Sequence, residues 1–69
     1  MWILINGEVR EVEDESTLGS VVAAELPDVD ARRGVAVAHN HQVVRRALWD
    51  DTALSEASRV EIVSAVQGG

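Results

Sequence analysis

The two final glycines, Gly68 and Gly69, are the residues of this 69-residue chain whose chemistry is easiest to name. Glycine has no Cβ, so two in succession form a thin, adaptable peptide that a narrow tunnel would accept. The last residue also carries an α-carboxylate, which can attack the α-phosphate of ATP and form an acyl adenylate. Sulfur or nitrogen nucleophiles can then displace the AMP. A terminal Gly-Gly is a weak signal by itself, so the remaining sequence must decide whether it is functional.

The other polar residues predict no catalytic centre in this chain. No serine lies in a Gly-x-Ser-x-Gly elbow, and the chain has no cysteine. His39 and His41 are expected as exposed, solvated side chains in a turn, and two histidines make a poor structural zinc site. We therefore predict a protein that is not an enzyme, with no metal and no bound cofactor. ATP and magnesium would be used by a partner that activates the terminus.

The charge balance narrows the choice of partners. Twelve acidic and 6 basic residues give a net charge of −6 at pH 7, which disfavours nucleic acid and favours basic protein surfaces. No apolar run approaches the roughly 18 residues of a membrane span. The opening "MWILINGEVRE" lacks the basic region of a signal peptide. We expect a cytoplasmic protein that contacts neither membrane nor nucleic acid.

The first half of the sequence predicts a β-hairpin followed by a helix. Within residues 2–13, "WILI" and "EVREVE" flank Asn6-Gly7, a strong two-residue turn signal. Val9 is expected to cover the same core as the two isoleucines of the first strand. Ser16 or Thr17 is the expected helix N-cap, and Pro27 ends the helix. The apolar stripe of this helix consists of Leu18, Val21, Val22 and Leu26.

The second half predicts three more strands. "GVAVAHNHQVV" forms two strands around Asn40-His41, and "RVEIVSAV" forms the last one. The stretch between them is expected to be mostly irregular, with inward anchors at Leu48, Trp49 and Leu54. This order predicts an α+β fold of the ubiquitin-like β-grasp type: a mixed five-stranded sheet covered on one face by one main helix. The domain would span residues 1–66, with residues 67–69 as a flexible Gly-Gly tail.

In a β-grasp the last strand lies parallel beside the first, and one face of the sheet stays open. On that face we expect Trp2 and Leu4 to neighbour Val63 and Ala65 as a compact apolar patch. Such patches usually mark a partner site, although Trp2 could instead shield only its own strand. The expected partner-binding residues are Trp2, Leu4, Val63, Ala65, Val66 and Gln67.

Three stretches carry a resemblance that covers essentially the whole chain. "ILINGEVRE", "GVAVAHNHQVVRRALW" and "RVEIVSAVQGG" resemble the ThiS family, the sulfur carrier proteins of thiamine biosynthesis. The resemblance implies that a ThiF-like enzyme adenylates Gly69 and that a sulfur donor enzyme helps convert it to a thiocarboxylate. It further implies that a ThiG-like thiazole synthase receives the sulfur.

The chain departs from the family pattern in its loops. His41 follows Asn40 where glycine is usual, Arg45 precedes Arg46 where proline is usual, and Ala57-Ser58 replaces a frequent Gly-Asp. None of these positions lies in the tail. Three alternatives stay open: the small subunit of molybdopterin synthase, another Gly-Gly sulfur carrier, or a β-grasp interaction module whose glycines are incidental.

Overall fold

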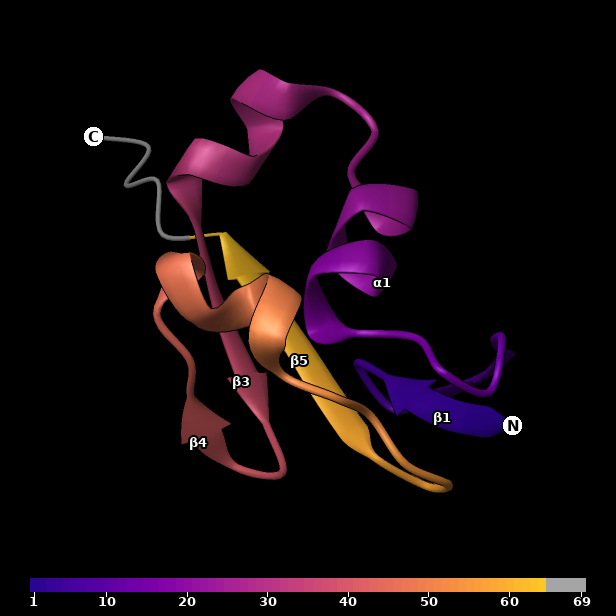
Figure 1. Ribbon diagram of the computed structural model, residues 1–69. Helices are drawn as coiled ribbons and strands as arrows, with labels where there is room; N and C mark the ends of the chain where they lie inside the picture. Colours follow the sequence, from indigo (N-terminus) through magenta and orange to yellow (C-terminus); the bar gives the residue numbers. More distant parts are fainter. Residues whose placement is uncertain (65–69) are drawn as a thin grey trace.

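A computed structural model describes residues 1–64 of the chain (Figure 1). In chain order, a hairpin and a helix are followed by a second hairpin and a last strand, with two 3₁₀ helices in the connections. The strands are β1 (Trp2–Ile5), β2 (Glu8–Glu11), β3 (Val35–His39), β4 (Gln42–Val43) and β5 (Arg59–Ser64). The helices are α1 (Leu18–Glu25), η1 (Val29–Gly34) and η2 (Arg46–Asp51).

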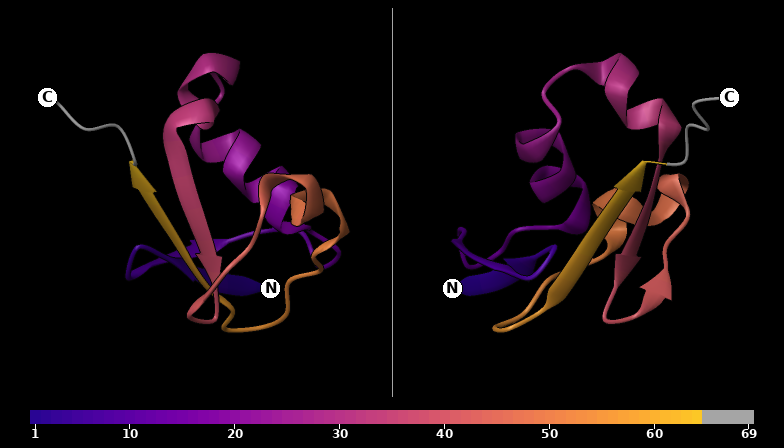
Figure 2. Two further views of the ribbon diagram at one scale, coloured as in Figure 1. Left: turned by 90° about the vertical axis from the view of Figure 1, so that its left-hand side faces the viewer. Right: turned by 180° about the vertical axis from the view of Figure 1, so that it is seen from behind.

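The strands form one five-stranded mixed sheet in the order β2-β1-β5-β3-β4. β1 and β5 are parallel, and the other neighbouring strands are antiparallel. α1 and η2 lie on the same side of the sheet, as the two views of Figure 2 show. The other face has no helix over it within the described residues. The predicted strand order and the single main helix are therefore confirmed.

Helix α1 begins at a capping box. The Thr17 hydroxyl accepts from the Ser20 backbone N at 3.1 Å, and the Ser20 hydroxyl accepts from the Thr17 backbone N at 3.1 Å. This reciprocal pair satisfies amide groups that have no partner in the first turn. Of the two predicted N-caps, the structure selects Thr17. Leu26 is the C-cap, directly before Pro27.

The core lies between the sheet and the helices. Its buried apolar side chains are Ile3, Ile5, Leu18, Val21, Val22, Val37, Trp49, Leu54 and Val60. The indole Nε1 of Trp49 donates to the Val44 carbonyl at 2.8 Å, so this large ring is buried with its polar atom satisfied.

The prediction that Leu48 is an inward anchor is wrong, because its side chain is 45% exposed. Successive side chains of a 3₁₀ helix point about 120° apart, so Leu48 cannot share the direction of Trp49.

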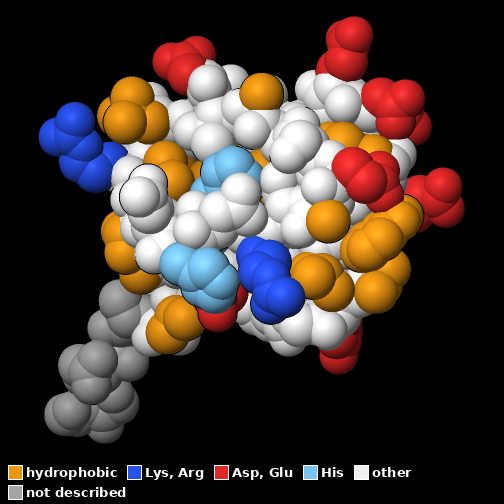
Figure 3. All heavy atoms as spheres, turned by 90° about the horizontal axis from the view of Figure 1, so that it is seen from below, with side chains coloured by type: hydrophobic (Ala, Val, Ile, Leu, Met, Phe, Trp, Pro, Cys, Tyr) orange, Lys and Arg blue, Asp and Glu red, His pale blue; other side chains and the backbone are white. Residues whose placement is uncertain are grey.

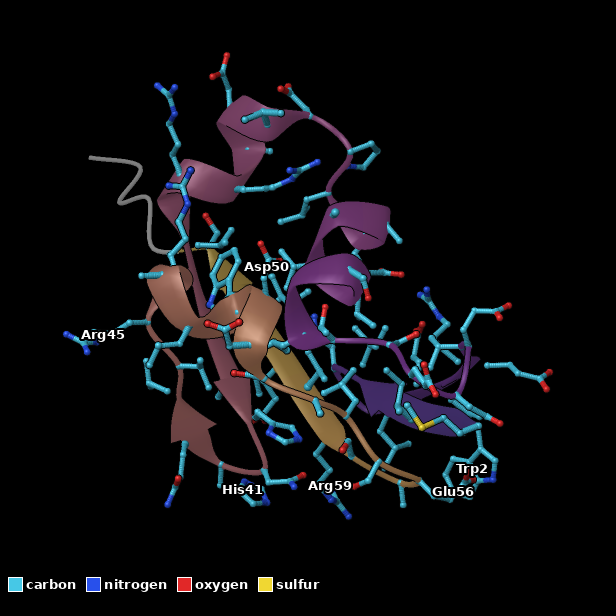
Figure 4. All side chains as sticks on the ribbon, viewed as in Figure 1. Trp2, His41, Arg45, Asp50, Glu56 and Arg59 are labelled. Atoms are coloured by element: carbon cyan, nitrogen blue, oxygen red, sulfur yellow. The ribbon has the colours of Figure 1, made fainter. Side chains whose placement is uncertain are left out.

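Gly19 permits the close approach of α1 and η2. A Cβ at this position would collide with the carboxylate of Asp50, which Figure 4 labels between the two helices. Glycine costs about 1 kcal/mol relative to alanine inside a helix. Here the missing side chain makes room for η2 against the first turn of α1.

Candidate functional site

β5 is the strand that leads toward the C terminus, and it lies in the middle of the sheet. It pairs with β3 along its length, from Val60 opposite His39 to Ser64 opposite Val35. Its pairing with β1 covers only the start, with Leu4 opposite Arg59 and Ile5 opposite Val60. The polypeptide of the first hairpin turns away after Ile5, so the later part of β5 needs other partners on that side.

The side chain of Asn6 supplies those partners. Its Nδ2 donates to the Ile62 carbonyl at 3.3 Å, and its Oδ1 accepts from the Ile62 backbone N at 2.8 Å. An amide side chain carries the same donor and acceptor as a peptide group. Asn6 therefore takes the place of one further residue of β1 and extends the parallel pairing to Ile62.

Asn40, in the second turn, holds the other end of β5. Its backbone N donates to the Arg59 carbonyl at 2.8 Å, and its Oδ1 accepts from the Arg59 backbone N at 2.8 Å. Both asparagines adopt left-handed backbone conformations, with φ of 50° in each case. We call these two sets of contacts the asparagine clamps. Together they hold β5 near its first and its fourth residue.

Ser58 anchors the chain immediately before β5. Its side chain is buried, and its Oγ accepts from the Ser55 backbone N at 2.9 Å and lies 3.0 Å from His39 Nε2. The prediction that His39 is exposed is wrong, because it is half-buried and bonded to Ser58, whereas His41 is exposed as predicted. The alternation of β3 explains the difference, since His39 lies on the same face as buried Val37.

The open face of the sheet is not one apolar patch. Trp2 and Val63 are exposed, at 44% and 60%, but the strand register separates them. Arg59 lies beside Leu4, and Glu61 follows on the same face before Val63. The predicted compact patch is therefore wrong in its geometry. Figure 3, from below, shows a basic side chain between the histidines and a group of hydrophobic side chains, and Figure 4 places Arg59 between His41 and Trp2.

Two smaller apolar clusters result from this register. The first contains Trp2, Leu4 and Val9, which is 64% exposed and lies opposite Leu4. The prediction that Val9 covers the core is thus wrong, because the two-residue turn aligns Val9 with Leu4 rather than with the isoleucines. The second cluster contains Val63 opposite Ala36, and Val43 opposite Ala38. Strand alternation in the sequence could have placed Val43 on this face.

An ion pair fixes the open end of the first hairpin. The Met1 ammonium group lies 2.8 Å from the Asp14 carboxylate and donates to the Val12 carbonyl at 2.9 Å. The hydrogen bond that the Met1 ammonium donates to Asp14 is the main cause that raises the pKa of this ammonium, and the same bond lowers the pKa of Asp14. The acidic stretch before α1 thus contributes one specific contact.

Five residues of the predicted site lie outside the described part of the chain: Ala65, Val66, Gln67, Gly68 and Gly69. Their roles, and the boundary between a domain ending at residue 66 and a tail, stay predictions.

Within residues 1–64, no group of three or more potential ligand side chains is arranged to hold a metal ion. Across the same residues, no helix has the length and apolar composition required to cross a membrane.

The mixed sheet, its parallel central pair and the helix across one face define a ubiquitin-like β-grasp protein. The fold is similar to the crystal structure of the thiamine biosynthesis protein ThiS from Geobacter metallireducens, with a TM-score of 0.80. The alignment covers 100% of both chains at 22% sequence identity. A search of curated proteins found no match.

The model of the ThiS family matches residues 3–69, and the chain belongs to this family. It is accordingly a small carrier protein of the thiamine biosynthesis type rather than a catalyst. The resemblance recognised in the three sequence stretches is confirmed.

Proposed function

We propose that this protein carries sulfur as a thiocarboxylate on Gly69 and delivers it to thiazole formation in thiamine biosynthesis. The observation that carries the proposal is the placement of β5. This strand is paired on both sides and held by the asparagine clamps. Only five residues, ending in Gly68-Gly69, follow it in the sequence. Such an arrangement suits a rigid domain that presents a thin peptide to another enzyme.

The chemistry proceeds in two substitutions at the terminal carboxyl group. A carboxylate oxygen of Gly69 attacks the α-phosphorus of ATP, and pyrophosphate leaves. Hydrosulfide supplied by the donor then attacks the carbonyl carbon of the acyl adenylate, AMP leaves, and the thiocarboxylate remains. This chain supplies only the carboxylate and its peptide. The ATP and magnesium sites belong to a ThiF-like partner, the sulfur comes from a donor enzyme, and a ThiG-like thiazole synthase consumes the product.

The proposal treats residues 1–66 as the domain and residues 67–69 as the tail that enters the partners. It assigns recognition to the open face, through Trp2 and Leu4 in one cluster and Val63 in the other. Ala65, Val66 and Gln67 would continue this contact toward the reactive end. The pathway places the carrier in the cytoplasm, where ATP is available.

Intact-protein mass spectrometry tests the terminal chemistry. The protein is incubated with ATP, magnesium, a ThiF-like enzyme and a sulfur source, and we expect a mass gain equal to sulfur replacing oxygen. Deletion of Gly69 should abolish this gain. No adduct, under conditions in which an established carrier reacts, would reject the proposal. Transfer to molybdopterin synthase in place of thiazole synthase would assign the chain to the alternative pathway.

A substitution pair tests the recognition surface. Val63→Asp should reduce the rate of adduct formation strongly, because it places a charge on the open face near the end of β5. Val29→Asp is the matched control, since Val29 is 54% exposed on η1, away from the open face. Trp2→Ala should weaken partner binding more than it lowers stability. Equal loss of binding and stability would assign Trp2 a purely structural role.

A further inference from the structure

A groove of about 550 Å³ lies between β2 and α1, on the helix side of the sheet. Apolar side chains line its base, including Ile5, Val12 and Val21. Arg10 and Glu25 line it toward the end of α1, where their ion pair connects strand and helix. The groove is separate from the open face and from the end of β5, so the proposed terminal chemistry makes no use of it.

β2 forms one edge of the sheet, and its register leaves backbone groups facing outward. Val12 N donates to Met1 O at 2.8 Å, and Met1 N donates to Val12 O at 2.9 Å. Hydrogen-bonded pairs alternate along an antiparallel ladder, so the next bonded residue of β2 is Arg10. The N–H and C=O groups of Val9 and Glu11 consequently point away from β1. An added strand could pair with them.

The charges around the groove are predominantly negative. Glu11 and Glu13 line it, are exposed, and form no ion pair with any other residue in the range 1–64. The single basic side chain of the lining, Arg10, is already matched by Glu8 at 3.3 Å and by Glu25 at 2.5 Å. A positively charged ligand is therefore favoured over a neutral or acidic one.

We propose that this groove binds an extended, lysine- or arginine-containing segment of a partner protein, which adds to β2 as a sixth strand. Main-chain hydrogen bonds to Val9 and Glu11 would hold the segment, and alternate side chains would enter the groove over Val12 and Val21. The remaining side chains, if basic, would lie beside Glu11 and Glu13. The site leaves β5 and Val63 accessible, so one partner can stay bound while the terminus reacts elsewhere.

Nuclear magnetic resonance titration with the peptide acetyl-Lys-Val-Lys-Val-Lys-Val-Lys-amide tests the proposal on the full chain. We expect saturable shifts of the amides of Val9, Glu11 and Ala24, and slower hydrogen exchange at Val9 and Glu11. The same peptide with glutamates in place of lysines should not bind. Shifts centred on Trp2 and Val63, or no saturable shift at millimolar peptide, would overturn the proposal.

Two substitutions test whether residues of the groove determine the affinity for the peptide. Ala24 is exposed on α1 and lines the groove, so Ala24→Trp should fill it and weaken the peptide at least tenfold. Glu13→Lys should weaken it about two- to fivefold, the usual range for an exposed charge pair. Glu61→Lys makes the same change of net charge on the open face and should leave the affinity within twofold of the unmodified protein. If the two lysine substitutions weaken the peptide equally, binding depends only on the net charge of the protein, and the proposal of a specific groove is contradicted.

Discussion

The two hairpin turns of this protein perform the same task with different residues. Each begins with an asparagine at φ 50° that bonds to β5, but the next residue is Gly7 in the first turn and His41 in the second. Gly7 has a φ of 85° and His41 a φ of 74°. Both turns therefore require a left-handed second residue, a conformation that glycine adopts freely and histidine adopts at a cost.

The clamps also differ in which atoms hold β5. Asn6 uses both ends of its side-chain amide and its backbone N, which donates to the Val60 carbonyl, whereas Asn40 contributes one side-chain oxygen and its own backbone N. Each asparagine thus makes one backbone bond to β5 that does not depend on residue identity, but Asn6 adds two side-chain bonds and Asn40 adds one. Substitution of the asparagine therefore removes more bonds at Ile62, nearer the C terminus, than at Arg59.

The largest expected effect is that of Asn6→Gly. Glycine keeps the left-handed backbone but removes both bonds to Ile62, so we expect a loss of about 2 kcal/mol in the free energy of unfolding. Urea denaturation measures the loss, and hydrogen exchange should accelerate at the Ile62 amide in particular. Unchanged exchange at Ile62 would contradict the clamp.

Asn40→Gly should cost about half as much, roughly 1 kcal/mol, because only the bond from the Arg59 N–H to the side chain is lost. The backbone bond from residue 40 to the Arg59 carbonyl remains possible. The same denaturation experiment provides the comparison. If the two glycine variants lose equal stability, the distinction between the clamps is wrong.

Exchanging the second residue of each turn, Gly7 and His41, measures the free-energy cost of a left-handed conformation for a residue other than glycine. His41→Gly should stabilise the protein by about 1 kcal/mol, because it relieves a left-handed non-glycine residue. Gly7→His should destabilise it by a similar amount, and a Cβ at Gly7 meets no atom within 4 Å, so steric collision does not contribute. Thermal and urea unfolding of both variants would check the opposite signs.

The smallest effect concerns the ion pair between Met1 and Asp14 at the open end of the first hairpin. The bond to the Met1 ammonium lowers the pKa of Asp14. The contribution of this carboxylate to the free energy of unfolding is therefore present above its ordinary pKa of about 3.9 and is lost as the pH falls through the lowered pKa. The raised pKa of the Met1 ammonium has the opposite dependence on pH. The contribution of the ammonium to the free energy of unfolding is complete below its ordinary pKa of about 8 and is lost as the pH rises through the raised pKa.

Asp14→Asn should therefore reduce the melting temperature slightly between about pH 4 and 8, with no difference from the parent at more acidic or strongly alkaline pH. A melting series across this range checks the window. A constant offset at every pH would assign the effect of the substitution to something other than the charge pair.

Local patterns were enough to predict most elements of this fold. The Asn-Gly turn, the apolar stripe of α1 and the alternation around Val60 each reflect neighbours in the sequence. The central position of β5 followed from the β-grasp arrangement. At the three loop departures, His41 and Ala57 adopt the left-handed φ of 74° and 68° that glycine adopts freely. Arg45 has a φ of −64°, close to the value that proline would fix.

The errors arose where a side chain's surroundings depend on register or on a distant segment. The separation of Trp2 from Val63 depends on the offset between two strands that lie more than fifty residues apart in the sequence. No pattern among neighbouring residues in the sequence predicts that Asn6 bonds to Ile62 or that Asp50 lies against Gly19. The position of Leu48 depended on the winding of η2, which the composition of that stretch did not reveal.

The parallel pairing of β1 and β5 has a mechanical consequence. Leu4 N donates to Ser58 O at 2.9 Å and Asn6 N donates to Val60 O at 2.8 Å, with both bonds lying across the strand direction. Traction applied along β5 from beyond Ser64 loads these bonds and the Asn6 amide together, in shear, instead of opening them one at a time. An enzyme that draws on this end of the chain would thus pull against the sheet as a unit, and the strand would transmit the force without peeling away.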